Sequence, residues 1–271
     1  MIFATEKTEL NGVYKVHLEN FSDDRGQIVN LFDTGQFPTF KVDKLSKSKR
    51  NVLRGLHGDA TNDKLTITNS QIYNVSSFGI LGRATSIRAE NLVINNAGQS
   101  SFAGTYGGKY NFTHCTIANY WNSSFRQFPA LLLNDFIVDE NNTVFTNDLV
   151  EANFNNCIIY GNDNPEFLLE NEGEVFNYKF TNCLLRFDNN NLDGQGNYDF
   201  ENLTFYENNL FNQDPDFEDP FSNKMRIGAD SAADGIGLSI FASQVPNDIL
   251  NVSRTVDPDA GAYQSVVFDE D

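Results

Sequence analysis

One residue type returns at a nearly constant interval through most of this chain of 271 residues. An asparagine, or once a histidine, follows an apolar or small residue by two positions about every 22 residues. A fixed period in the twenties indicates a solenoid, in which each repeat forms one winding. The sequence therefore predicts about seven windings, one at each of the positions Asn69, Asn91, His114, Asn134, Asn156, Asn182 and Asn202.

The residues between these positions distinguish the kinds of solenoid that have such a period. Leucine-rich repeats need several leucines at fixed offsets and a helical segment in each repeat, and this sequence has neither. Short runs of Phe, Ile, Val, Leu, Thr and Tyr alternate instead with Asn, Asp, Gly and Ser, which is typical of strands and turns. Runs such as residues 92–94 and 157–160 are too short for helices. The sequence predicts an all-β fold, a parallel β-helix over residues 65–271.

Stacking of equivalent positions gives the recurring asparagines a physical reason. Equivalent positions in a parallel coil lie about 4.7–4.9 Å apart. An amide both donates and accepts hydrogen bonds, and Asn tolerates the left-handed backbone of a tight bend, so we expect a ladder of amides. Cys115, Cys157 and Cys183 each follow a ladder position. We expect them to be buried free thiols, since their number and spacing fit neither a disulfide framework nor a zinc site.

Charge is distributed unevenly along the chain. Residues 1–65 hold ten Lys and Arg against nine Asp and Glu, whereas residues 66–271 hold nine against 28, and the net charge is −18. The acidic part argues against nucleic acids and anionic membranes as partners and fits neutral glycans, cations or solubility alone. The start of the chain lacks signal-peptide features and no apolar run reaches membrane-spanning length, which predicts a cytoplasmic protein without membrane insertion.

The segment before residue 65 has a different pattern. It contains Asp-x-Arg-Gly at residues 23–26, Ser-x-Ser at 46–48 and Val-Leu-Arg-Gly-Leu-His at 52–57, in that order. This order resembles the first third of the dTDP-4-dehydrorhamnose 3,5-epimerases, which have a cupin fold. The pattern changes abruptly at Lys64-Leu65, which predicts two joined domains, an epimerase-like leader or cap at residues 1–64 and the β-helix at residues 65–271.

The epimerase resemblance implies roles for four residues. His57 would be the general base that removes the proton beside the keto group, and Lys64 would support the enolate. Arg54 would bind the nucleotide sugar and Arg25 its phosphates. The family also uses a later Tyr and an Asp, for which the sequence after residue 64 offers no match, so activity would need an oligomer that supplies them. A structural role in covering the open end of the solenoid is the leading interpretation of the leader, and partial disorder is the remaining alternative.

Residues 65–271 resemble the pectin-lyase-like proteins, which are right-handed parallel β-helices and include secreted and cell-surface bacterial members. The resemblance rests on blocks such as residues 69–74 and 154–162 and on the tail, with Asp-Pro-Asp-Phe at 214–217 and Asp-Pro-Asp-Ala-Gly-Ala-Tyr-Gln at 257–264. We expect this tail to form tight turns and a wrapped final coil. Because these proteins include lyases, hydrolases, binding proteins and stalks, the resemblance implies a fold but not an activity.

Candidate site residues in the β-helix are few. The Gly-His-Gly element of galacturonan hydrolases is missing, and His114, at a ladder position, is expected to be structural. The acidic loops follow no fixed order of calcium ligands, so we expect no metal and no cofactor. Tyr120, Trp121 and Arg126 belong to an aromatic-rich stretch that either contacts sugar rings or fills the core.

The leading prediction is a β-helix scaffold or carbohydrate-contacting protein without a complete catalytic site, with glycans or a sugar nucleotide as partners. One alternative is a 3,5-epimerase that relies on His57. The other is a polysaccharide lyase or hydrolase with an unrecognised site, for which Arg83, Arg88 and Arg126 are candidate bases that lack an evident acidic partner.

Overall fold

The computed structural model describes residues 65–188, 192, 194 and 196–268, together with the backbone of six strands before residue 65. The chain divides into two units, Met1–Arg54 and Gly55–Asp271, and each is described by itself. The division by contacts therefore falls before the predicted domain boundary at residues 64–65.

The first unit contains two small antiparallel sheets. One is the hairpin of β1 (Ala4–Lys7) and β2 (Tyr14–His17). The other pairs β3 (Asn20–Asp23) with β4 (Gly26–Asn30), and β4 in turn with β5 (Lys44–Ser48). Whether this unit covers an end of the solenoid stays a prediction.

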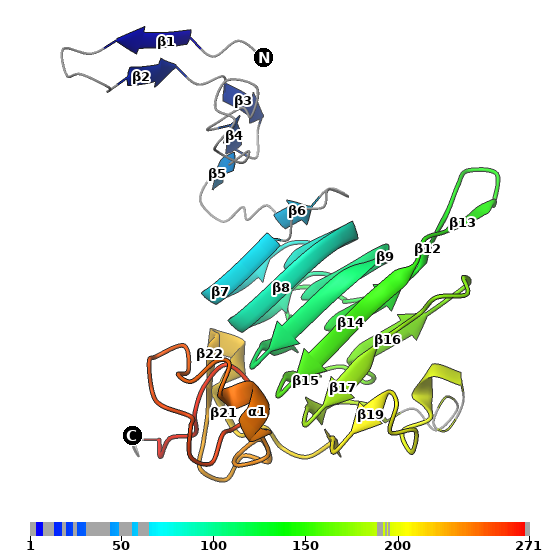
Figure 1. Cartoon of the computed structure of the whole chain (residues 1–271), viewed down its shortest axis with the longest axis vertical. Coiled ribbons are helices and arrows are strands. Elements are labelled where there is room, and N and C mark those ends of the chain that lie inside the picture. Colours follow the sequence, from blue (N-terminus) through cyan, green and yellow to red (C-terminus); the bar gives the residue numbers. More distant parts are fainter. Residues whose placement is uncertain are drawn as a thin grey trace. The chain divides into compact units, whose positions relative to one another are not determined.

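The second unit is a parallel β-solenoid with three faces and about five turns (Figure 1). The first face consists of β6 (Leu56–Gly58), the starts of β8 (Ile80–Ala97) and β9 (Phe102–Thr113), β11 (Leu131–Asn134) and β16 (Phe167–Glu170).

The second face follows the first in every winding. It consists of the start of β7 (Leu65–Val75), the middle of β8, the end of β9, β14 (Leu149–Asn155), β17 (Lys179–Thr181) and β19 (Tyr206–Glu207). In Figure 1 these strands lie side by side in this order.

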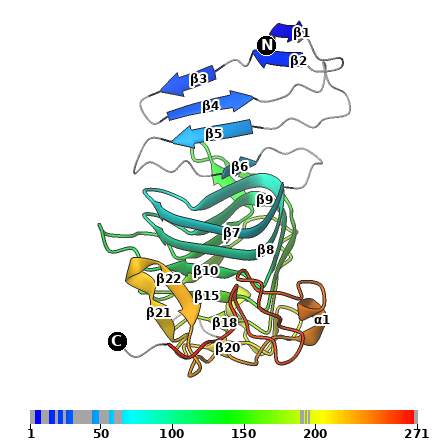
Figure 2. The ribbon, with the colours of Figure 1, turned by 90° about the vertical axis from the view of Figure 1, so that its left-hand side faces the viewer.

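The third face closes each winding. It consists of the ends of β7 and β8, then β10 (Thr116–Asn119), β15 (Ile158–Gly161), β18 (Leu184–Leu185) and β20 (Leu210–Phe211), which Figure 2 shows stacked in this order. The prediction of a parallel β-solenoid is thus confirmed.

The predicted number of seven windings is too high, because Asn134 does not mark a separate winding, and Asn202 is not the residue that marks its own winding. Asn134 ends β11 and belongs to the same turn as Asn156, which stacks on His114 although 42 residues separate them. The extra length of this turn includes a projecting hairpin of β12 (Phe136–Val138) and β13 (Val144–Thr146). Asn202 lies in the bends before β19, and Asn208, directly after β19, takes the stacked position instead.

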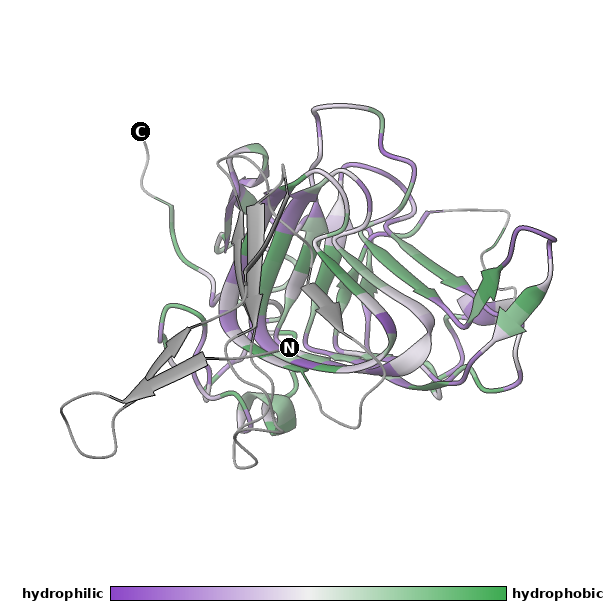
Figure 3. Cartoon of the chain, turned by 90° about the horizontal axis from the view of Figure 1, so that it is seen from above, coloured by the Kyte–Doolittle hydropathy of each residue, from purple (hydrophilic) through white to green (hydrophobic). Residues whose placement is uncertain are grey.

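Aromatic side chains stack in register inside the second face. Phe112, Phe154, Phe180 and Tyr206 follow one another with ring centroids 5.3, 5.0 and 5.5 Å apart. The three cysteines are free and buried inside the solenoid. Figure 3 shows apolar and hydrophilic residues alternating along many of the strands, as expected when one side of each strand faces the core.

The C-terminal part lies along the side of the solenoid rather than forming the predicted final winding. It contains β21 (Phe217–Asp219), the short 3₁₀ helix η2 (Pro220–Ser222), β22 (Lys224–Ile227) and one helical turn, α1 (Ser239–Ala242). Residues such as Ile227, Ala260 and Ala262 cover the outward apolar side chains of the third face, including Val93 and Ile158 (Figure 2). The described part of the chain contains no helix that is long and apolar enough to cross a membrane.

Candidate functional site

A one-residue corner joins the second face to the third in each winding. The corner residues share a left-handed backbone with φ between 46° and 52°, and they are Asn69, Asn91, His114, Asn156, Asn182 and Asn208. Left-handed backbone disfavours most side chains but is accessible to Asn and His, which explains the residue types at these positions. Five of these six positions are among the seven predicted from the sequence.

The corner amides make fewer contacts with one another than a continuous ladder requires. Asn91 Nδ2 donates to Asn69 Oδ1 at 2.9 Å, and Asn156 Nδ2 donates to His114 Nε2 at 3.0 Å. The same amide groups also bond the C-terminal segment, since Asn91 donates to the Asn247 carbonyl at 2.9 Å and Asn156 to the Leu238 carbonyl at 3.1 Å. The corner therefore positions residues 238–247 alongside the solenoid.

The two misplaced ladder positions make local contacts instead. Asn134 Oδ1 accepts the backbone N–H of Tyr106 at 3.0 Å on the first face. Asn202 Oδ1 accepts the N–H of Thr204 at 3.0 Å within its own turn. Neither has a left-handed backbone, so the assignment of both to the ladder is wrong.

His114 is buried at its corner, and its contacts there fit a structural role. Its side chain is buried, and burial lowers its pKa well below the ordinary value of 6.5, with a further contribution from the positive charge of Arg254. Arg254 is itself fully buried and donates to Asn91 Oδ1 at 3.1 Å and to the Gly261 carbonyl at 3.2 Å. A neutral imidazole therefore accepts the bond from Asn156.

We expect His114→Asn to remove part of the acid sensitivity of the fold. Because burial lowers the folded-state pKa, the unfolded chain binds a proton first as the pH falls below 6.5. Stability from the neutral imidazole is complete above that value, and each pH unit below it costs up to about 1.4 kcal/mol. Asn occupies the other corners and does not titrate, so His114→Asn keeps a side chain suited to the corner and removes the titrating group. Urea unfolding of both proteins at pH 7 and pH 5 measures this, and a stability difference that is equal at both pH values would contradict it.

The residue directly before each corner points out of the solenoid into a groove. The residue two positions before the corner, such as Phe112 or Phe154, is buried in the core. Because side chains alternate along a strand, the residue between it and the corner points outward. In successive strands these outward residues are Thr68, Glu90, Thr113, Asn155, Thr181 and Glu207.

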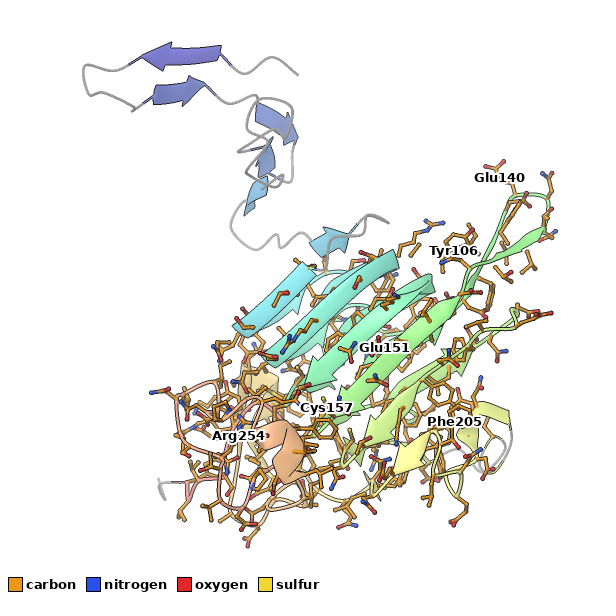
Figure 4. The ribbon with its side chains drawn as sticks, viewed as in Figure 1. Tyr106, Glu140, Glu151, Cys157, Phe205 and Arg254 are labelled. Atoms are coloured by element: carbon orange, nitrogen blue, oxygen red, sulfur yellow. The ribbon has the colours of Figure 1, made fainter. Side chains whose placement is uncertain are left out.

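Residues of the C-terminal segment form a wall opposite this polar strip, and the strip and the wall together enclose a groove. Leu238, Phe241 and Gln244, in and around α1, stand opposite the strands and enclose a volume of about 520 Å³ with them. The corner bond from Asn156 to Leu238 holds this wall in place. In Figure 4 Glu151 marks the second face that forms the floor beside the groove.

Two ion pairs and one hydrogen-bonded carboxylate lie on the second face. Arg88 pairs with Glu90, and Lys179 Nζ lies 2.6 Å from Glu207 Oε2. Glu151 Oε1 accepts the amides of Asn111 and Asn153 at 2.9 and 2.8 Å. The groove therefore offers hydroxyl, amide and paired charged groups rather than a strong field of one sign. The prediction that Arg88 lacks an acidic partner is wrong, because Glu90 follows it on the same outward side.

The aromatic-rich stretch singled out in the sequence lies elsewhere, in the loop between β10 and β11. Arg126 is 6% exposed and donates to both carboxylate oxygens of Glu166, at 2.6 and 2.8 Å. Its guanidinium is thus occupied inside the protein, which favours the core-filling alternative for Arg126 over sugar contact. Tyr120 packs edge-on against Phe217 and Phe221, and Trp121 Nε1 donates to Ser124 Oγ at 3.0 Å.

Glu166, the buried carboxylate that pairs with Arg126, also accepts hydrogen bonds from the backbone. Burial raises the pKa of Glu166, while Arg126 and the N–H groups of Asp163 and Ala130 oppose that rise. These N–H groups lie 2.8 Å from the carboxylate oxygens. Glu166 therefore serves as a structural anchor for the loop.

The residues of the epimerase resemblance lie largely outside the described residues. This applies to Arg25, Arg54, Lys64 and the side chain of His57. The backbone of His57 lies in the middle of β6, opposite Leu81 in β8, and so belongs to the first face of the solenoid. Their predicted catalytic and binding roles stay predictions.

Sequence reasoning missed the groove, although a signal for it exists. The residue before each correctly predicted corner is polar in every case, and this regularity indicates an outward polar strip. The wall residues Leu238, Phe241 and Gln244 carry no comparable signal, because a loop places them. Among the described residues, no group of three or more His, Cys, Asp and Glu side chains could hold a metal ion.

The structure defines the class of the second unit as a parallel β-solenoid. The family model for dTDP-4-dehydrorhamnose 3,5-epimerase matches residues 7–76, about a quarter of the chain, which supports the resemblance stated for the leader. The match ends just after β7, within the first winding. No curated protein and no solved structure matches the chain.

Proposed function

We propose that the solenoid is a carbohydrate-contacting scaffold and that the groove between the second face and α1 is its contact surface. The observation that carries this proposal is the strip of outward polar side chains, one per strand, facing a wall that includes Phe241. Hydroxyl and amide groups pair with sugar hydroxyls as donor and as acceptor. An aromatic ring supplies an apolar face for the C–H side of a sugar ring.

Replacing Phe241 by alanine is expected to weaken glycan binding by about tenfold, equivalent to about 1.4 kcal/mol, because it removes the aromatic part of the wall. Binding to an array of neutral and acidic glycans identifies a ligand, and calorimetric titration of that ligand measures the change. Phe125→Ala is the matched control, since Phe125 is 90% exposed and does not line the groove. Equal affinities of the Phe241 variant and the unchanged protein would contradict the assignment.

The family match at residues 7–76 supports a second candidate, a sugar-nucleotide 3,5-epimerase in which His57 is the base. Incubation with dTDP-4-keto-6-deoxyglucose in deuterated water tests it. Deuterium at C3 or C5 that disappears in His57→Ala would establish this activity. A polysaccharide lyase or hydrolase is tested by release of unsaturated products or reducing ends from the glycans that bind.

A further inference from the structure

Two neighbouring hollows along the second face together make up the combined groove. The first is the groove beside α1, and the second, of about 370 Å³, is lined by residues that include Thr68, Glu90 and Asn247. Gln244 lines both hollows. The combined groove crosses the strands from Glu207 at one end to Thr68 at the other, parallel to the solenoid axis.

The floor of this groove repeats with the spacing of the windings. Thr68 pairs in register with Glu90, and each next outward residue pairs with its neighbour through Thr113, Asn155, Thr181 and Glu207. Neighbouring strands lie about 4.7–4.9 Å apart, so the five steps between these six residues span about 24 Å. A ligand along the axis therefore meets a polar side chain at a constant interval, except that Thr181 is only 4% exposed.

The charges beside this strip select against a strongly charged ligand. Arg88 and Lys179 are each neutralised by a glutamate of the strip, and Glu151 is bound by two amides. The solenoid as a whole is acidic, since residues 66–271 hold 28 Asp and Glu against nine Lys and Arg. Among the described residues that line the two hollows, Arg88 and Lys179 are the cations, and both are paired, so an anionic chain would find no unpaired cation there to offset that repulsion.

We propose that the combined groove binds an extended, neutral, β-1,4-linked polysaccharide along the solenoid axis, with about one sugar per winding. This inference rests on the proposed function and names its ligand class. An extended β-1,4-linked chain advances per sugar by a length close to the strand spacing, so each sugar lies over about one winding. Because successive sugars of a flat chain are turned by about half a turn, the same sugar edge returns over every second winding. An α-1,4-linked glucan curves away from a straight groove.

Calorimetric titration with oligosaccharides of increasing length tests this proposal. The probes are cello-, manno- and xylo-oligosaccharides of two to six sugars, with malto-oligosaccharides for comparison. For the series that binds, affinity is expected to rise by about tenfold or more between two and five sugars, equivalent to about 1.4 kcal/mol. Affinity should change by less than about twofold between 50 and 500 mM salt, because no net charge is neutralised.

An end-of-groove variant adds a test of position. Thr68→Ala removes an exposed hydroxyl at one end of the groove, and it should weaken hexasaccharide binding several-fold and by a larger factor than disaccharide binding. Affinity that is constant from two sugars upward, or tighter binding of malto-oligosaccharides or polygalacturonate, would contradict binding of a neutral β-1,4-linked chain along the axis. Either result would still agree with glycan contact in the groove. Failure of every neutral and acidic glycan to bind would overturn both.

Discussion

Glu166→Ala is expected to lower the free energy of unfolding by up to about 3–5 kcal/mol, because it removes the buried carboxylate that pairs with Arg126. The buried charge of Arg126 then keeps only the half-exposed Asp163 as an ionic partner, 3.1 Å away. Both side chains of the pair of Arg126 and Glu166 are almost inaccessible, at 2% and 0% exposure. The substitution also removes the acceptor for the N–H groups of Ala130 and Asp163. Urea-induced unfolding followed by fluorescence or circular dichroism measures the loss.

A double variant separates the unpaired charge from general damage to the loop. In Arg126→Met with Glu166→Leu no charge stays buried, so we expect this protein to be more stable than Glu166→Ala alone. A single variant that loses less than about 1 kcal/mol would contradict the account, since the pair would then resemble a surface ion pair.

Phe154→Ala is expected to cost about 3–5 kcal/mol of unfolding free energy, the range for removing a buried phenylalanine ring. Phe154 is fully buried, and its ring lies between those of Phe112 and Phe180, at 5.3 and 5.0 Å. Its loss opens a cavity in the middle of the stack, where windings on both sides lose contacts.

Phe125→Ala provides the comparison for this stability effect. Phe125 is 90% exposed, so its removal should change stability by no more than about 0.5 kcal/mol. Equal effects of the two substitutions would show that the stacked rings do not stabilise the solenoid as described.

The sequence was sufficient for the solenoid because every winding repeats the same local requirements. A one-residue left-handed corner needs Asn or a similar residue, and the core on either side of it needs apolar residues such as Phe112, Cys115 or Phe154. These demands recur in each turn, so they leave a period that can be read without knowing any contact.

The count of windings failed where a winding departs from that period. The turn between His114 and Asn156 contains the loop before β11 and the β12–β13 hairpin, and Asn134 happens to fall near the expected interval. Asn is abundant in turns for reasons unrelated to stacking, as the local bond of Asn202 to Thr204 illustrates. Spacing alone does not distinguish the two uses of Asn.

The groove depends on contacts between distant parts of the chain. Asn156 and Leu238 are 82 residues apart, and their mutual hydrogen bonds place α1 beside the strands. The buried pair of Arg126 and Glu166 joins residues 40 positions apart. The sequence indicates the residue types of such pairs but not the pairing, so it predicts neither the buried position of Arg126 nor the place of Phe241 in the wall.

Hydrogen–deuterium exchange of the full chain, with and without a bound oligosaccharide, tests the assignment of the groove most directly. If the groove between the second face and α1 is the contact surface, backbone amides of residues 238–249 should exchange more slowly in the complex. Slower exchange confined to the loop of Tyr120, Trp121 and Arg126, with residues 238–249 unchanged, would contradict the assignment.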